Sequence, residues 1–172
     1  TPTGFNSMRW NAVAAAARPP SRMQLDSVSR GRVDRPEKLL IFGTEGVGKT
    51  TFAAGAETPV FVCPEDGAPH VNVARFPEPL TWLDSFDAIA SLGTGKHDYK
   101  TFVVDSVDWL EPLCWKHICD RDGKANIESY GYGKGYVAAL DEWRKLLAAF
   151  ERLRRERLMR IILVAHAVIR TF

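Results

Sequence analysis

The segment "FGTEGVGKTT", residues 42 to 51, constrains the fold more than any other part of the chain. Four residues separate Gly43 from Gly48, and Lys49 and Thr50 follow, which completes the pattern G-x-x-x-x-G-K-[ST]. The segment follows the apolar run "KLLIFG" and precedes a stretch expected to be helical, the context in which backbone N–H groups enclose phosphate oxygens. The sequence therefore predicts a strand, a phosphate-binding loop and a helix, in this order.

Each position of this loop has an expected task. The Lys49 ammonium group is expected to reach the β- and γ-phosphates of a nucleotide, and the Thr50 hydroxyl to ligate Mg²⁺. The predicted nucleotide-binding residues are Gly43, Thr44, Glu45, Gly46, Val47, Gly48, Lys49, Thr50 and Thr51. Phosphate-bound magnesium also needs an acidic ligand, normally at the end of an apolar strand, and "TFVVDS" supplies Asp105 there. Asp108 competes for this task, and Asp105 could instead cap a helix.

Apolar runs alternate with amphipathic segments along the chain. Strands are expected at about 38–43, 59–63, 101–105 and 160–168, and helices at about 49–56, 81–92, 109–119 and 137–157. Such alternation predicts an α/β fold with a mostly parallel sheet and helices on both faces. Ligands of these folds bind at the carboxyl ends of the strands, where the polar residues of interest fall.

The size and composition of the chain exclude several classes of protein. Its 172 residues suit a single α/β core, taken as residues 23–172, after a flexible leader or arm at 1–22. A net charge of +2 is too small for nucleic-acid binding through the electrostatic field of the whole molecule, and no apolar run approaches the length of a membrane span.

Three cysteines without a disulfide spacing predict that the protein works in a reducing cytoplasm. Cys114, His117 and Cys119 lack the paired spacing of a metal site.

Hydrolysis of a bound nucleotide would need a residue that orients or deprotonates water. Glu65, after the second strand, is preferred over Asp108 because its side chain is longer and its strand is expected beside the phosphate-loop strand. His166 ends the last strand at the same edge of the sheet. It is expected either to contact the γ-phosphate or the attacking water, or to be a core histidine with satisfied hydrogen bonds.

Three stretches together carry a resemblance to a known family. "FGTEGVGKTTFA", "DYKTFVVDSVDWLEPL" and "ESYGYGKGYVAALDEWR" are similar to the RecA-like ATPases, most closely to phage and prophage nucleotide-binding ATPases related to RecA. The resemblance implies a P-loop NTPase fold that uses ATP and Mg²⁺, with Glu65 as the catalytic glutamate, Asp105 as the magnesium ligand and His166 as the polar switch residue. It also implies self-association. The family's last strands and second DNA-binding loop would follow Phe172, so the expected core lacks its C-terminal strands.

The resemblance places the first DNA-binding loop at 120–136, a stretch without helical period. Its basic residues Arg121, Lys124 and Lys134 offer phosphate contacts, and its aromatic residues Tyr130, Tyr132 and Tyr136 offer faces on which bases stack. The alternative is a surface loop whose tyrosines pack back on the domain.

These observations lead to one hypothesis with two alternatives. The preferred hypothesis is a magnesium-dependent ATPase that couples ATP to single-stranded DNA in recombination or annealing. The alternatives are a small-molecule kinase that uses the same phosphate loop, and a module that binds nucleotide with little turnover. No arginine-rich lid lies between the third and fourth expected strands, which weakens the case for a kinase.

Overall fold

The computed structural model of the chain describes residues 23–32, 35–64 and 71–167. The chain divides into two compact units, Thr1–Val33 and Asp34–Phe172. Within the described part of the first unit, the structure forms one 3₁₀ turn, η1 (Leu25–Ser27). The strands and α-helices described below all belong to the second unit.

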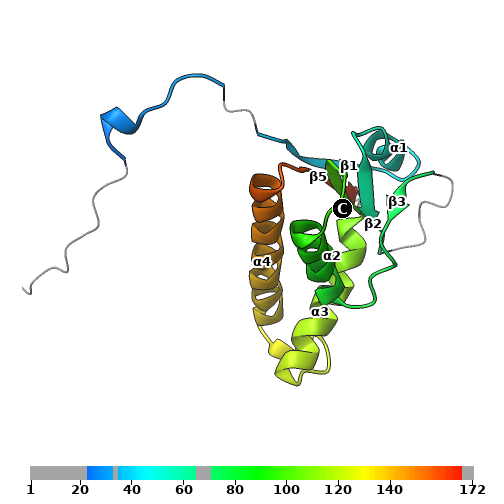
Figure 1. The fold of residues 1–172 in the computed structure, drawn as a ribbon. Helices are drawn as coiled ribbons and strands as arrows, with labels where there is room; N and C mark the ends of the chain where they lie inside the picture. The colour runs from blue at the N-terminus through cyan, green and yellow to red at the C-terminus, as the bar shows by residue number, and fades with distance from the viewer. Residues whose placement is uncertain (1–22, 33–34, 65–70, 168–172) are drawn as a thin grey trace, which may run out of the picture. The chain divides into compact units, whose positions relative to one another are not determined.

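The second unit is built on a parallel sheet, as the sequence predicts (Figure 1). Its strands are β1 (Lys38–Gly43), β2 (Pro59–Val62), β3 (Ala74–Arg75), β4 (Thr101–Asp105) and β5 (Arg160–His166). Their order across the sheet is β1-β5-β4-β2-β3, and every neighbouring pair is parallel. The sequence did not predict β3, because two residues are too few to show an alternating pattern.

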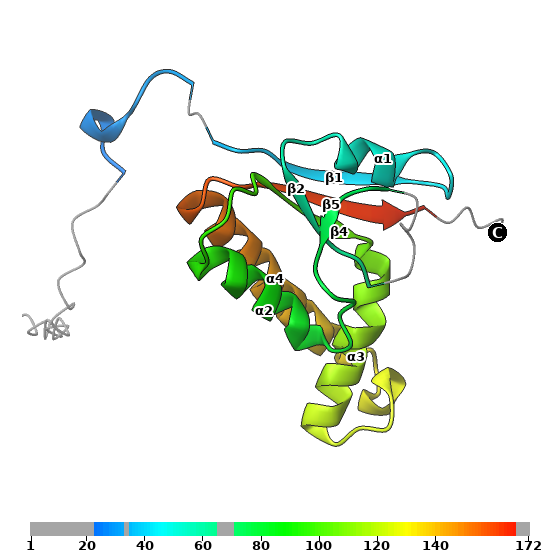
Figure 2. The same cartoon turned by 45° about the vertical axis from the view of Figure 1, so that its right-hand side comes forward.

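Helices cover both faces of this sheet, which completes the predicted α/β fold. They are α1 (Lys49–Ala54), α2 (Trp82–Thr94), α3 (Val107–Asp122) and α4 (Lys134–Glu156). In Figure 2, α1 lies on one side of the strands, and α2, α3 and α4 lie on the other. In the described ranges, none of the helices has the length and apolarity that crossing a bilayer requires.

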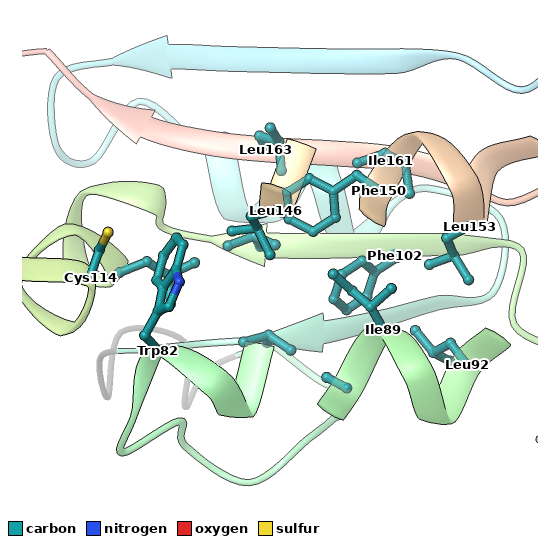
Figure 3. Packing of buried hydrophobic residues seen from close by; sticks show 14 of the residues in the cluster. Trp82, Ile89, Leu92, Phe102, Cys114, Leu146, Phe150, Leu153, Ile161 and Leu163 are labelled. Carbon is teal, nitrogen blue, oxygen red and sulfur yellow. The ribbon is translucent and has the colours of Figure 1, made fainter. Parts of the chain in front are cut away.

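Alternate residues of the central strands enter two separate cores. On β4, Phe102 and Val104 pack with the three long helices, whereas Val103 packs on the α1 side. Figure 3 shows the larger core, which contains Leu146 and Phe150 of α4 and in which the rings of Phe150 and Phe102 lie 6.0 Å apart between centroids. Both faces of β4 are buried, so all five of its residues are buried and its apolar residues Phe102, Val103 and Val104 are consecutive rather than alternating.

The connection between α3 and α4 is shorter than predicted. The sequence predicted a loop over 120–136, but α3 continues to Asp122 and α4 begins at Lys134. The remaining residues, 123–133, contain the 3₁₀ turn η2 (Ile127–Tyr130). Glycines with positive φ flank the connection: Gly123 ends α3 at φ 62°, and Gly133 precedes α4 at φ 70°. These glycines suggested a loop, but they mark the ends of the helices.

Two adjacent leucines of α4 test the assignment of the core. Leu146 is fully buried against the sheet, and Leu147 is 41% exposed. We expect Leu146→Ala to lower the free energy of unfolding by about 2–5 kcal/mol through lost burial and a residual cavity. Leu147→Ala should lower it by less than about 1 kcal/mol. Urea denaturation of both variants measures the difference, and equal losses would contradict the orientation of α4.

Candidate nucleotide-binding site

The order of the strands brings the predicted site residues to one edge of the sheet. β5 lies between β1 and β4, so the strand that ends at His166 lies beside the strand that leads into the phosphate loop. His166 is paired in register with Gly43, and Asp105 with Val164. Since all three strands are parallel, their carboxyl ends meet here, which is where α/β folds bind ligands.

The backbone of the predicted phosphate loop takes conformations that favour glycine. Gly46 has φ 78° and Gly48 has φ 88°, values in the left-handed region that side chains rarely adopt. Lys49 follows as the first residue of α1 and is 7% exposed. Its Nζ donates to the carbonyl oxygens of Gly43 at 3.0 Å and Thr44 at 2.8 Å. An ammonium group has three N–H donors, so one remains for a ligand.

Thr50 and Asp105 meet although they lie 55 residues apart in the chain. The Thr50 hydroxyl donates to Oδ2 of Asp105 at 2.6 Å. Asp105 is 6% exposed, and no cationic side chain of the described residues forms an ion pair with it. A buried carboxylate without a countercharge is costly. One carboxylate and one hydroxyl are oxygen donors that Mg²⁺ accepts together with phosphates and water, so the pair fits this ion.

His166 is held by two residues at the start of α3. Its backbone N–H donates to Oδ2 of Asp108 at 2.7 Å, and its ring Nδ1 lies 3.1 Å from the same oxygen. The Ser106 hydroxyl lies 3.3 Å from this Nδ1. The sequence pointed to Asp108 only as a competitor for magnesium or water. Its contact with His166 had no local signal, because the two residues are 58 positions apart.

The predicted catalytic residue Glu65 lies outside the described residues, and its task stays a prediction. One reason for preferring it was wrong: β2 was expected beside the phosphate-loop strand, but β5 and β4 lie between β2 and β1. Three strand spacings amount to about 14 Å. The strand before Glu65 instead neighbours β4, which ends at Asp105. The wrong strand order followed from treating strands consecutive in sequence as neighbours in space.

Two of the predicted DNA-binding residues are bonded within the domain. Arg121 donates from Nη1 to Glu142 at 2.8 Å and from Nε to Asp122 at 2.7 Å. The Tyr130 hydroxyl lies 2.9 Å from the Ile118 carbonyl oxygen and 2.7 Å from an Asp122 carboxylate oxygen. Burial of the hydroxyl and this carboxylate raise the pKa of Tyr130 to about 12. Arg121 and Tyr130 therefore stabilise the end of α3.

Tyr136 also packs on the domain, whereas Tyr132 does not. The Tyr136 hydroxyl donates to Glu128, which raises the pKa of that tyrosine, and its ring stands edge-on to Trp115. Tyr132 is fully exposed and has φ 48°. Lys124 and Lys134 are exposed as well, with Lys124 Nζ 5.7 Å from the centre of the Tyr130 ring.

The three cysteines are buried free thiols. Burial, followed by the charges of Glu142 and Glu111, raises the pKa of Cys114 to about 12, so this thiol is protonated at neutral pH. Within the described ranges, no group of three or more His, Cys, Asp or Glu side chains is arranged to hold a metal ion.

The parallel sheet, the glycine-rich loop and the strand-end residues define a P-loop NTPase-type α/β domain. A family model described as an AAA domain matches residues 35–172, which is most of the chain. The chain therefore belongs to this AAA domain family, a P-loop ATPase family. A comparison with curated proteins found no match.

Two glycines test whether the loop backbone has the left-handed conformation. Gly48→Ala should lower the free energy of unfolding by about 1–2 kcal/mol, because a side chain is strained at φ 88°. Gly93, in α2, has open space where a Cβ would lie and no positive φ, so Gly93→Ala should be neutral or raise stability by up to about 1 kcal/mol. Thermal and urea unfolding measure both. Equal effects would contradict the loop conformation.

Proposed function

We propose that the chain binds ATP with Mg²⁺ and hydrolyses it, as a RecA-like ATPase of the phage type that couples nucleotide state to single-stranded DNA. The observation that carries the nucleotide part is the contact of the Thr50 hydroxyl with the buried Asp105 carboxylate beside the phosphate loop. This contact supports the proposal because a hydroxyl and a carboxylate, both suitable oxygen ligands for Mg²⁺, lie together where the phosphate loop enters α1.

Different groups of the phosphate loop would contact different parts of the nucleotide. The N–H groups of residues 43–51 would bind the phosphates, and the remaining N–H of Lys49 would donate to the β- and γ-phosphate oxygens. Thr50 and Asp105 would hold the ion. When bound, Mg²⁺ would neutralise charge that develops on the phosphates during transfer.

Hydrolysis further requires an oriented water molecule. We assign this task to Glu65, which follows β2 in the sequence. His166, the last residue of β5, would contact the γ-phosphate or the attacking water, and β2 and β5 flank β4. His166 is level with Gly43, where the phosphate loop begins. Asp108 is the weaker candidate for a base, because one of its oxygens already accepts two hydrogen bonds.

The DNA part of the proposal rests on residues 123–133 and the start of α4. Tyr132 offers an exposed ring, and the exposed ammonium groups of Lys124 and Lys134 lie nearby in the sequence. Stacking on aromatic rings combined with phosphate contacts is how single strands are bound without sequence preference. Arg121, Tyr130 and Tyr136 support this segment from within the domain. RecA-like ATPases commonly self-associate, and we include self-association in the proposal.

The enzymatic part is tested by phosphate release from ATP. We expect Lys49→Ala to lower turnover at least about 100-fold, the usual cost of removing a donor that acts on developing charge. Chelation of Mg²⁺ should abolish turnover. The matched control Lys116→Ala removes an exposed ammonium group of α3 and should retain it. Equal turnover by both lysine variants, or turnover without Mg²⁺, would contradict the proposal.

The DNA part is tested by binding of a fluorescent oligodeoxythymidine at low salt with ATP and Mg²⁺. Tyr132→Ala should lose about 1–3 kcal/mol of binding free energy, the typical contribution of one stacked base. Tyr136→Phe keeps its packed ring and should bind normally. If the wild-type chain does not bind, or if Tyr132→Ala binds as tightly as wild type, residues 123–133 are not the DNA-binding segment.

A further inference from the structure

The contact between Asp108 and His166 determines where the imidazole proton lies. Oδ2 of Asp108 is 2.7 Å from the backbone nitrogen of His166 and 3.1 Å from Nδ1 of its ring. A backbone amide is a donor, and a carboxylate offers only lone pairs, so both hydrogen bonds run toward Asp108. A neutral ring that donates to Asp108 carries its proton on Nδ1.

This assignment leaves Nε2 unprotonated. A neutral imidazole has one donor nitrogen and one acceptor nitrogen, and the partner of the first fixes the second. An unconstrained imidazole in water prefers the opposite tautomer, with the proton on Nε2. Within the described ranges, Nε2 of His166 makes no hydrogen bond, and the side chain is 30% exposed.

Ser106 does not turn these residues into a hydrolytic triad. Its hydroxyl approaches the same Nδ1 that faces Asp108, whereas a nucleophile and an orienting carboxylate must contact opposite nitrogens of the ring. Ser106 is also fully buried, so no substrate carbonyl reaches its oxygen. The Ser106 hydroxyl is therefore a second polar group beside Nδ1, in addition to the Asp108 carboxylate.

We propose that Asp108 is a positioning residue that holds His166 with Nε2 as a hydrogen-bond acceptor, so that His166 contacts the attacking water and not the γ-phosphate. Phosphate oxygens are acceptors, and an unprotonated nitrogen cannot donate to them. Water has hydrogens to donate, and its orientation is what hydrolysis requires. The inference rests on the proposed ATPase function and selects one of the two contacts expected for His166.

The first test measures the tautomer directly and needs no turnover. Long-range ¹H–¹⁵N correlation spectra of the full chain at neutral pH distinguish a protonated from an unprotonated ring nitrogen, and His166→Asn identifies the signals of His166. We expect unprotonated Nε2 in the wild type and a shift toward protonated Nε2 in Asp108→Ala. Asp108→Asn should keep the wild-type pattern, because an amide oxygen can accept both hydrogen bonds.

The control Asp120→Ala removes an exposed carboxylate from the same helix and should leave the His166 signals unchanged. Circular dichroism and thermal unfolding check that each variant folds, and Asp108→Asn keeps the test informative if Asp108→Ala does not fold. Protonated Nε2 in the wild type would overturn the inference even if the chain hydrolyses ATP.

The second test separates turnover from binding. Asp108→Ala should lower kcat about 10-fold or more with KM little changed, the usual cost of losing the partner that orients a functional histidine. Asp108→Asn should restore most of kcat, because it keeps the proton on Nδ1. If Asp108 only stabilised the fold, kcat would not follow the tautomer of His166 from one variant to the next. If Asp108→Ala shifted the tautomer but left kcat unchanged, the inference would be overturned and the proposed ATPase function would stand. Absence of ATP turnover in the wild type would overturn the proposed function as well.

Discussion

The position of β5 between β1 and β4 is the constraint on which the candidate site depends. It makes the strand after α4 the direct neighbour of the strand that enters the phosphate loop, and it sets His166 level with Gly43. The same strand holds β4 at the distance from which Asp105 reaches Thr50. A shift of one residue in the pairing of β5 would turn its buried side chains to the opposite face, so the two cores also fix the geometry of the site.

Local features of the sequence predicted much of this arrangement. The phosphate loop was predictable because its glycines and Lys49 have tasks set by the backbone and by phosphate chemistry, which need no knowledge of distant residues. The position of Asp105 was predictable because a carboxylate directly after an apolar run marks the carboxyl end of a buried strand, where α/β folds bind ligands. The α/β class followed from the alternation of strands and helices. These predictions share one property: each depends on a short stretch of chain.

Contacts between distant residues that no motif links could not be predicted. The order of the strands is a global property, and placing β2 beside β1 was therefore wrong. The contact of Asp108 with His166 joins elements 58 residues apart. The three tyrosines near the start of α4 look equivalent in sequence. In the structure, Tyr130 donates a hydrogen bond to Asp122, Tyr136 packs edge-on against Trp115, and Tyr132 is exposed. Which aromatic ring is exposed depends on how the turn between α3 and α4 folds back.

Helix α3 connects the two regions that the proposed function requires. Its first turn carries Asp108, and its last residue, Asp122, lies next to the segment that presents Tyr132. Sixteen residues of α-helix span about 24 Å at 1.5 Å per residue. If the helix moved as a rigid body, a tilt of about 5° at its first turn would displace its far end by about 2 Å. In the proposed function, a small adjustment beside His166 would therefore be enlarged at the end of α3 that lies next to Tyr132, unless the helix bends at Pro112 in its interior.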